Sequence, residues 1–563
     1  MRASRRVAKN VTARLAVVRA VVTRRLAIAA ACLATVTACR ASPTPAREAP
    51  ERPLPRIVES GGRHALLVDD APYLMLGAQV NNSSAWSSTL RRVWPAVEAI
   101  HANTVEIPVY WEQVQPEPEK FDFSLVDTLL AQGREHHVHL VLLWFATWKN
   151  GSGHYMPEWM KVSPQRFPRA IDVHGRPIDS PSPYARETLD ADARAFAALM
   201  GHLKATDRER TVLMVQVENE AGTWGSVRDY SPAAQSVFEG AVPRELLAAL
   251  HPDGPMPSGS WRDVFGDDAD ETFHAWSVAR YVGAVAAAGK AVYPIPLYAN
   301  AALRDPLNPG RPGHYESGGP TDNVIAVWKA AAPALDLVAP DIYMSDSPRY
   351  LKVLDLYDRP DNALFVPETG HAPAYARYLF AALDHGAIGF SPFGVDYTGY
   401  SNAPLGAPKI DEETLSPFAL NYRLVGPMDR AIARLAFEGK LRAVVEEKDK
   451  PRQAIELDGW TATAAYGLGS FGPGDHPAGN PEPVGRALIA ELARDQFLVA
   501  GFFCRVDFAP RDPDKKREFL RVEEGDYDGA EFHPARIWNG DQTDWGLNFA
   551  SAPQVLRVSL GTY

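Results

Sequence analysis

The chain has 563 residues, of which 46% are hydrophobic and 23% are charged, a balance typical of a folded globular protein. This composition excludes a mainly disordered or fibrous chain, because it leaves enough apolar material for a large core. Acidic residues outnumber basic ones by 69 to 58, which gives a formal charge of −11, so we expect no nucleic-acid partner.

The first 39 residues have the features of an export signal. Arg24 and Arg25 precede an apolar run over residues 26–39 that ends in small residues, and this pattern predicts a secretory signal. The run is shorter than the ~20 residues that span a bilayer. Its end, Val36-Thr-Ala-Cys39, resembles a bacterial lipobox with Cys39 as the lipidated residue, and a plain signal peptide cut nearby is the alternative. We expect an exported protein, periplasmic or held at the outer membrane only by a lipid anchor.

Residues 40–59 are rich in proline and have no hydrophobic periodicity, which predicts an extended linker. Of the three cysteines, only Cys504 lies beyond this region, and its apolar neighbours predict a core position. The sequence contains no Cys-x-x-Cys pair, His-Glu-x-x-His helix or Gly-x-x-x-x-Gly-Lys loop. We therefore expect neither a structural metal nor a cofactor.

Residues 60–435 alternate short apolar runs with segments of helical period, which predicts an α/β fold. Several runs are apolar on both faces, as parallel strands covered by helices are. Eight such strands favour a (β/α)₈ TIM barrel over a doubly wound open sheet, because no Gly-x-Gly-x-x-Gly turn follows the first strand. The predicted strands are residues 74–79, 103–109, 138–144, 211–218, 294–300, 337–343, 363–368 and 387–393, and the predicted helices include residues 90–102, 125–136, 189–205, 272–289, 323–332, 349–357 and 374–385.

Residues 436–563 lose the helical period. Short runs alternate polar and apolar residues between turn residues, which predicts a smaller all-β, sandwich-like accessory domain. Such runs occur at residues 441–446, 453–457, 486–492, 496–508 and 554–560.

Two of the predicted barrel strands end in glutamates. The fourth ends in Gln216-Val-Glu-Asn-Glu220, and the seventh ends at Glu368. Because alternate residues of a strand share a face, we expect Gln216, Glu218 and Glu220 to point into the barrel, with Glu220 at its top. Catalytic groups of such barrels sit at the carboxyl ends of the strands, so Glu220 and Glu368 should face each other across one mouth.

A facing pair of carboxyl groups is what cleavage of a glycosidic bond requires. One group donates a proton to the departing oxygen, and the other, in its ionised form, attacks or stabilises the anomeric carbon. A separation of about 5–5.5 Å makes the second group a nucleophile and the reaction retaining. The competing interpretation is that each glutamate forms an ion pair on the barrel rim.

These residues carry a family resemblance. Gln216-Val-Glu-Asn-Glu220 resembles the Gln-x-Glu-Asn-Glu signature of glycoside hydrolase family thirty-five, the β-galactosidases, and residues 103–116 with Phe121-Asp-Phe123 resemble its second-strand segment. The resemblance implies Glu220 as acid/base, Glu368 as nucleophile and Asn219 as a partner of the sugar 2-hydroxyl. Because Asn219 and Glu220 are adjacent, both can face inward only if the chain bends or bulges there.

The resemblance has one gap, because Ala146-Thr-Trp148 stands where better-known members carry a triplet ending in glutamate that contacts galactose hydroxyls. This implies the bacterial branch, whose members have a β-rich C-terminal domain and remove galactose from polysaccharides such as xyloglucan. Further candidates for substrate binding are Tyr343 as a partner of the nucleophile, Trp111, Trp144 and Trp148 as an aromatic floor, and Asn150, Asp396 and Tyr397 in loops at the barrel mouth.

Taken together, the sequence predicts an exported retaining exo-β-galactosidase that acts on galactosylated oligo- or polysaccharides. One alternative is the same machinery acting on another β-glycoside, such as a glucoside, arabinopyranoside or mannoside. The other is a non-catalytic carbohydrate-binding lipoprotein, although binding alone does not require two facing acids.

Overall fold

A computed structural model describes residues 52–467 and 477–563, and Arg52–Tyr563 form one compact unit. The predicted export signal, Cys39 and residues 40–51 of the predicted linker lie outside the described residues. Within the described ranges, no helix has both the length and the apolar character needed to cross a membrane.

Eight parallel strands form a closed barrel, which confirms the predicted (β/α)₈ architecture. The barrel closes where the last strand pairs with the first, Gly389 beside Met75. Nearly every strand residue is buried, because side chains fill the interior on one face and helices cover the other. The strands are β4 (Met75–Gln79), β5 (Thr104–Tyr110), β6 (His139–Lys149), β9 (Val212–Asn219), β10 (Leu297–Ala302), β11 (Leu337–Ile342), β12 (Val366–Thr369) and β13 (Gly389–Pro392).

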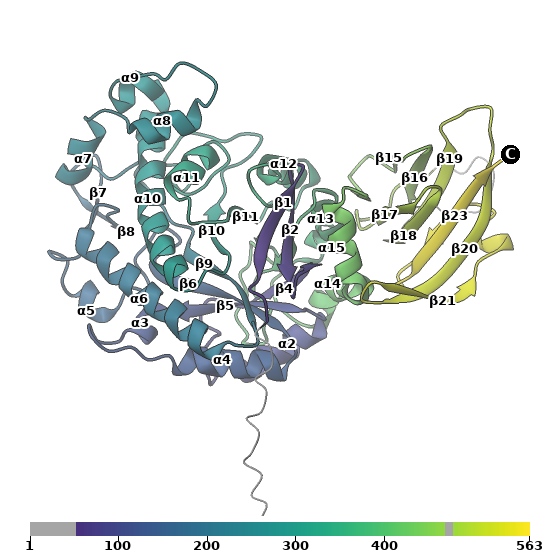
Figure 1. The fold of residues 1–563 in the computed structure, drawn as a ribbon, viewed down its shortest axis with the longest axis horizontal. Coiled ribbons are helices and arrows are strands. Elements are labelled where there is room, and N and C mark those ends of the chain that lie inside the picture. The colour runs from purple at the N-terminus through teal and green to yellow at the C-terminus, as the bar shows by residue number, and fades with distance from the viewer. Residues whose placement is uncertain (1–51, 468–476) are drawn as a thin grey trace, which may run out of the picture. The chain divides into compact units, whose positions relative to one another are not determined.

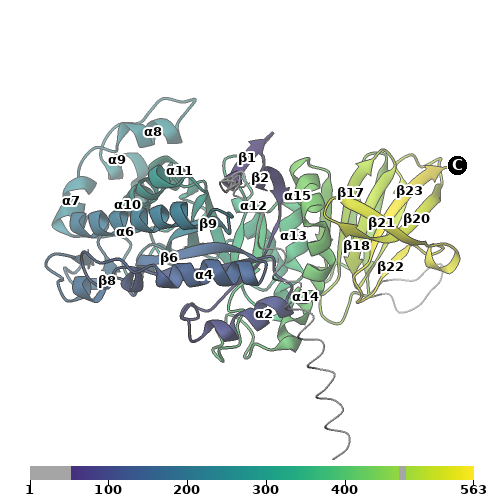
Figure 2. The same cartoon turned by 60° about the horizontal axis from the view of Figure 1, so that its bottom comes forward.

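Helices surround the barrel, and the long helices α6 and α10 lie side by side over its β6–β9 wall (Figures 1 and 2). Helical spacing of apolar residues places one face of each helix on the strands; in α4, for example, Leu125, Leu129 and Val126 are buried. The main helices are α2 (Trp94–Ala99), α4 (Ser124–Glu135), α6 (Arg186–Thr206), α10 (Ala269–Val292), α11 (Ile325–Ala331), α12 (Ser347–Tyr357), α13 (Tyr378–Asp384), α14 (Glu412–Val425) and α15 (Asp429–Phe437).

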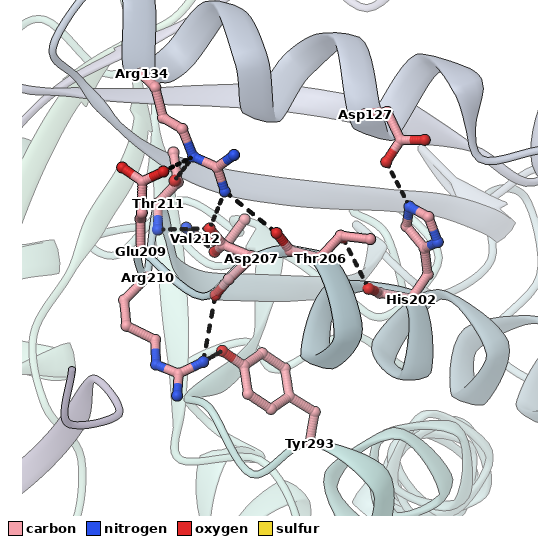
Figure 3. A network of polar contacts seen from close by, with 10 residues as sticks. All are labelled: Asp127, Arg134, His202, Thr206, Asp207, Glu209, Arg210, Thr211, Val212 and Tyr293. Carbon is pink, nitrogen blue, oxygen red and sulfur yellow. Dashed lines mark hydrogen bonds and ion pairs between the residues drawn. The ribbon is translucent and has the colours of Figure 1, made fainter. Parts of the chain in front are cut away.

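The turn from α6 into β9 is held by one buried carboxylate (Figure 3). Asp207 accepts hydrogen bonds from the backbone N–H groups of Thr211, at 3.0 Å, and Val212, at 2.8 Å. The guanidinium of Arg134 on α4 donates to the same carboxylate at 2.8 Å and to the Thr211 hydroxyl at 2.9 Å. These contacts fix the N-terminal end of the strand whose other end carries the Gln216–Glu220 motif.

The residues before the barrel form a small antiparallel sheet of β1 (Arg56–Ser60), β2 (Arg63–Val68) and β3 (Ala71–Tyr73). The linker prediction is therefore wrong for residues 56–59. These residues pair with β2 from Arg56 opposite Leu67 to Ser60 opposite Arg63, so their backbone groups are bonded in a ladder.

The C-terminal region contains two antiparallel sheets, one of six strands and one of four (Figure 1). Side chains from both sheets, such as Trp460 and Tyr466 from one and Ile489 and Val499 from the other, share one apolar cluster, as in a sandwich. Residues 496–508, predicted as one run, divide between the two sheets at Phe503, where φ is +52°. The strands are β14 (Leu441–Val445), β17 (Arg486–Ala493), β18 (Gln496–Phe502), β23 (Val555–Thr562), β20 (Arg517–Asp528) and β21 (Glu531–Ile537) in one sheet, and β15 (Arg452–Glu456), β16 (Trp460–Tyr466), β19 (Cys504–Pro510) and β22 (Leu547–Phe549) in the other.

Candidate active site

A cavity of about 480 Å³ lies at the carboxyl ends of the barrel strands. Its walls come from residues at or after the ends of β4, β6, β9, β10, β11, β12 and β13, the edge at which such barrels place their functional groups. The lining residues are Asn82, Lys149, Asn150, Glu220, Trp224, Ala302, Leu303, Asp341, Tyr343, Met344, Glu368, Phe393, Tyr400, Asn402 and Leu405.

Three carboxyl groups converge in this cavity. One oxygen each of Glu220, Asp341 and Glu368 lies within 4.8 Å of the others. Asp341 on β11 and Glu368 on β12 are direct neighbours in the barrel register, and Glu220 follows β9. Residues 220 and 368, which are far apart in the sequence, therefore share one site.

The Glu368 carboxylate is held by two neutral donors. The amide of Gln79 on β4 donates to Oε2 at 2.9 Å, and the Tyr343 hydroxyl donates to Oε1. Burial, and then the charge of Glu368, raise the pKa of Tyr343 well above its usual range, so this phenol remains a donor. The contact is the one that the sequence analysis assigned to Tyr343. Both oxygens of Glu368 are thus fixed in direction, and no cationic side chain of residues 52–467 or 477–563 bonds to them.

Glu220 is placed to hold a proton. Its backbone N–H donates to the side chain of Asn300 at 2.9 Å, which orients the residue at the end of β9. Burial raises the pKa of the Glu220 carboxyl; Lys149 opposes this shift, and the charge of Glu368 adds to it. Because the net direction is upward, Glu220 is protonated to a higher pH than an ordinary glutamate.

The backbone is bent where the motif enters the cavity. Glu218 and Glu220 have positive φ values, +63° and +44°, which a regular strand does not contain. As a result Glu218 does not enter the cavity with Glu220, and that part of the prediction is wrong. Its carboxyl accepts a hydrogen bond from the Trp148 N–H at 2.7 Å and lies against Asp192 of α6.

Asp341 is a site residue that the sequence analysis missed. Its Oδ2 accepts a hydrogen bond from Asn300 Nδ2 at 2.6 Å, and its Oδ1 is buried without a hydrogen-bond partner among the described residues. Its position in the sequence could have indicated this role, because it is an acid close to the carboxyl end of the sixth predicted strand, where barrels place their functional groups.

Lys149 and Glu316 are two further ionisable side chains close to Glu220, and neither was predicted from the sequence. The Lys149 ammonium lines the cavity and donates to Asn150 Oδ1 at 2.5 Å. The Glu316 carboxyl is buried between two glycines, since a Cβ on Gly151 would lie 2.6 Å from its Oε1 and one on Gly222 3.0 Å from its Cγ. Burial, and then the charge of Glu220, raise the pKa of Glu316 well above its usual range.

The predicted aromatic floor is wrong. Trp111, Trp144 and Trp148 are each 0% exposed, and none lines the cavity. Their indole N–H groups bond to Gln115, Asp192 and Ser180, so these rings are satisfied core residues. The aromatic side chains at the cavity mouth are instead Trp224, 50% exposed, and Tyr400, 58% exposed.

The remaining predicted side chains divide between the cavity and the structure behind it. Asn150 lines the cavity, whereas Asn219 is fully buried against Gln216 and Asn300. Asp396 is also buried and holds the loop after β4, where Asn81 and Ser84 donate to its Oδ2. Tyr397 is half-buried beside it and is not part of the cavity wall. Asn219, Asp396 and Tyr397 therefore lie outside the cavity lining.

Three acidic oxygens so close together could in principle surround a small cation. Here, however, Gln79, Tyr343 and Asn300 direct hydrogens at two of the three carboxyl groups, and Lys149 contributes a positive charge beside Glu220. This donor set suits carboxyl groups that share protons better than it suits a metal ion.

In sequence, the model of a family described as a domain of unknown function (DUF5597) matches residues 418–550, which span the end of the barrel region and most of the C-terminal sheets. No curated protein matches the chain.

Among solved structures, the β-galactosidase of Bacillus circulans sp. alkalophilus is 13% identical, with 64% of this chain and 57% of that chain covered and a TM-score of 0.45. The β-galactosidase of Rahnella sp. R3 is 15% identical, with 64% and 58% covered and a TM-score of 0.45. The catalytic domain of β-amylase from Paenibacillus polymyxa is 15% identical, with 61% and 96% covered and a TM-score of 0.43. This chain spans less than two thirds of the length of either β-galactosidase.

Proposed function

We propose that the protein is a retaining glycoside hydrolase, specifically an exo-β-galactosidase that removes terminal β-galactosyl residues. The observation that carries this proposal is the approach of Glu220 and Glu368 to within 4.8 Å. That separation suits direct attack by one carboxylate, because an inverting enzyme needs about 6.5–9.5 Å to admit a water molecule between the two groups.

The two acids differ in the way that the reaction requires. Glu220–H protonates the departing glycosidic oxygen while a Glu368 oxygen bonds to the anomeric carbon, which gives a glycosyl ester and a free aglycone. Glu220 then removes a proton from water, the water oxygen bonds to the anomeric carbon, and the ester bond to Glu368 breaks. Forming the ester removes the charge of Glu368, which had raised the pKa of Glu220, so Glu220 becomes a better base when one is needed.

The proposed substrate is a neutral galactoside of an oligo- or polysaccharide such as xyloglucan. The ionised Glu368 of the proposed mechanism disfavours an acidic sugar, while Lys149, Asn150 and Asn82 offer polar groups to hydroxyls on the other walls. The exposed rings of Trp224 and Tyr400 stand at the mouth, where the sugar next to the scissile bond would leave the cavity. The choice of galactose rests on the resemblance of residues 216–220.

We further propose that the chain is exported and anchored through Cys39, as its first 39 residues suggest. Expression in a Gram-negative host with radiolabelled palmitate is expected to label the wild type and not Cys39→Ala. Equal absence of label in both would leave export by a plain signal peptide.

A panel of p-nitrophenyl glycosides tests the proposed activity. We expect release of p-nitrophenol from the β-galactoside, with β-galactose as the first product by NMR, and no release by Glu368→Ala. Glu112→Ala is the matched control, because Glu112 follows barrel strand β5 by two residues but contacts Lys161 outside this cavity. Preference for another β-glycoside would change the sugar assignment, and an α-product would overturn the retaining mechanism. Saccharide binding without any turnover would favour the carbohydrate-binding alternative.

A further inference from the structure

Asp341 is the carboxyl group of the cavity to which the proposed mechanism gives no role. It is close to both proposed catalytic acids, because one of its oxygens lies within 4.8 Å of an oxygen of Glu220 and of an oxygen of Glu368. It is 3% exposed, and it lines the cavity rather than the core. A buried acid in this place costs folding free energy and is therefore expected to have a functional reason.

The two oxygens of Asp341 have different surroundings. Oδ2 accepts the amide N–H of Asn300, whose own carbonyl oxygen accepts the Glu220 N–H, so one side chain orients both acids. Oδ1 accepts no hydrogen bond from any of the described residues. A carboxyl oxygen of Glu220 and one of Asp341 lie within 4.8 Å of each other. Hydrogen bonding between them lowers the pKa of Glu220 and raises that of Asp341, the directions expected when Asp341 is the donor. Two carboxyl groups can hydrogen-bond only if one of them carries a proton.

The charges around Asp341 favour its protonated form. Burial raises its pKa well above the usual range, the charges of Glu368 and Glu220 add to this, and Lys149 opposes it. The other titratable groups close to it are the phenols of Tyr343, Tyr298 and Tyr357, whose own pKa values are raised by burial, so they bring no charge of their own.

We propose that Asp341 is a positioning residue that acts as a neutral hydrogen-bond donor to Glu220. The proposal rests on the proposed function and deepens it. In the free enzyme, Asp341 and Glu220 each carry a proton and Glu368 is ionised. When Glu220 gives its proton to the leaving oxygen, Asp341–H donates to the new Glu220 carboxylate and stabilises it throughout the life of the glycosyl ester. No proton leaves Asp341, and Glu220 regains its own from the attacking water.

Substitution by asparagine separates this donor role from a role as an ionised acid. In Asp341→Asn the amide oxygen can still accept from Asn300, and the amide N–H can still donate to Glu220. We expect this variant to keep activity within about threefold of the wild type, whereas Asp341→Ala, which has no donor, is expected to lose about 10- to 100-fold in kcat. The loss should be smaller in kcat/KM for 2,4-dinitrophenyl β-galactoside, because that leaving group needs little proton donation and hydrolysis of the ester limits kcat.

The pH profile provides the readout that a purely structural role would not change. In the wild type, ionisation of Asp341 at high pH contributes to the loss of kcat, and in Asp341→Asn this contribution is absent, so its kcat is expected to hold to higher pH. Loss of activity in Asp341→Asn as severe as in Asp341→Ala would overturn the proposal, as would wild-type behaviour of Asp341→Ala. Unfolding curves in urea show whether Asp341→Ala is folded. If it is not, the activity and pH profile of Asp341→Asn alone test the proposal. If the wild type hydrolyses no β-glycoside, the proposed function itself is overturned. If the wild type is active and substitution of Asp341 does not change its activity, only the role of Asp341 is overturned.

Discussion

Glu218 and Glu220 are two residues apart at the end of β9, yet Glu218 lies against Asp192 of α6 while Glu220 lines the cavity. The positive φ values at both positions produce this divergence. Local strain of this kind costs of order 1–3 kcal/mol per residue and is found where function needs it. Here it separates two glutamates of one short motif into a buried partner of a helix and an acid of the site.

The Glu218–Asp192 pair should make stability depend on pH. Burial and the neighbouring Asp192 charge raise the pKa of Glu218 well above its usual range, so the folded protein holds a proton that the unfolded chain has lost above about pH 4.3. Stability therefore falls as pH rises toward the folded pKa. A glutamine at position 218 is neutral at all pH values. Between pH 5 and 8 we therefore expect the free energy of unfolding of Glu218→Gln to fall by about 1–2 kcal/mol less than that of the wild type. Urea unfolding measures this, with the exposed Glu209→Gln as control; parallel curves for wild type and Glu218→Gln would contradict it.

Removing the proton donor should harm poor leaving groups most. We expect Glu220→Ala to lose about 10²- to 10⁴-fold in kcat/KM for an alkyl galactoside and far less for 2,4-dinitrophenyl β-galactoside, which departs without a proton. Azide needs no general base, so it should restore turnover and give a β-galactosyl azide, identified by NMR. An α-azide, or equal losses with both leaving groups, would contradict the assignment of Glu220.

The charge of Lys149 should set the alkaline limit of activity. Lys149 lowers the pKa of Glu220, and the proposed mechanism needs Glu220 protonated to begin the reaction. In Lys149→Gln the pKa of Glu220 is higher, so the alkaline limb of the kcat/KM profile is expected to move to higher pH. Lys161→Gln is the control, because Lys161 contacts Glu112 and the His154 carbonyl outside the cavity lining. A limb that stays in place or moves to lower pH would contradict this prediction.

Trp224 should contribute to binding the aglycone rather than the sugar that is cleaved. It is 50% exposed at the cavity mouth, and an aromatic face suits the C–H surface of a second sugar ring. We expect Trp224→Ala to lose about 3- to 10-fold in kcat/KM for a galactosylated oligosaccharide, in line with 0.5–1.5 kcal/mol for an aromatic contact. β-Galactosyl fluoride has no ring in that place and should be hydrolysed almost normally. Trp86→Ala, an exposed tryptophan outside this cavity, is the matched control. An equal loss with the fluoride would contradict the assignment.

The sequence predicted the barrel well because strand and helix periods are local. All eight strands lie within a few residues of their expected positions, and the two strand-end glutamates follow from them. The surroundings of the glutamates were less predictable. Trp148 stands at the end of β6 and is nonetheless core, because which face of a barrel strand a ring occupies depends on bulges such as the register shift between Trp144 and Lys149.

Glu316 could not be predicted as a site residue from the sequence, because its place depends on a contact between distant loops. It lies in a long loop after β10 with no strand or helix period around it, so nothing local indicates that it is buried. It reaches Glu220 because backbone hydrogen bonds between Thr223 and Ser317, at 2.8 and 3.0 Å, join the loops that follow β9 and β10. Such pairings between distant segments depend on the complete fold.

The Asp207 turn should affect stability alone. Asp207 is fully buried and bonds two backbone N–H groups and Arg134 at the end of β9 opposite to Glu220. Asp207→Ala leaves the two backbone N–H groups without their acceptor and removes one partner of Arg134, and we expect a loss of about 2–4 kcal/mol in the free energy of unfolding. At a temperature where the variant is folded, kcat is expected to match that of the wild type. A large fall in kcat with unchanged stability would contradict this separation.

The same separation has a practical side. Since the Asp207 network occupies one end of the barrel and the acids occupy the other, the contacts that stabilise the α6–β9 turn and the residues that line the cavity lie in different parts of the sequence. Stabilising substitutions in residues 206–212 and altered cavity residues in 400–405 could therefore be selected in separate libraries. Because the two regions are far apart, the effects of the selected substitutions are expected to add when they are combined.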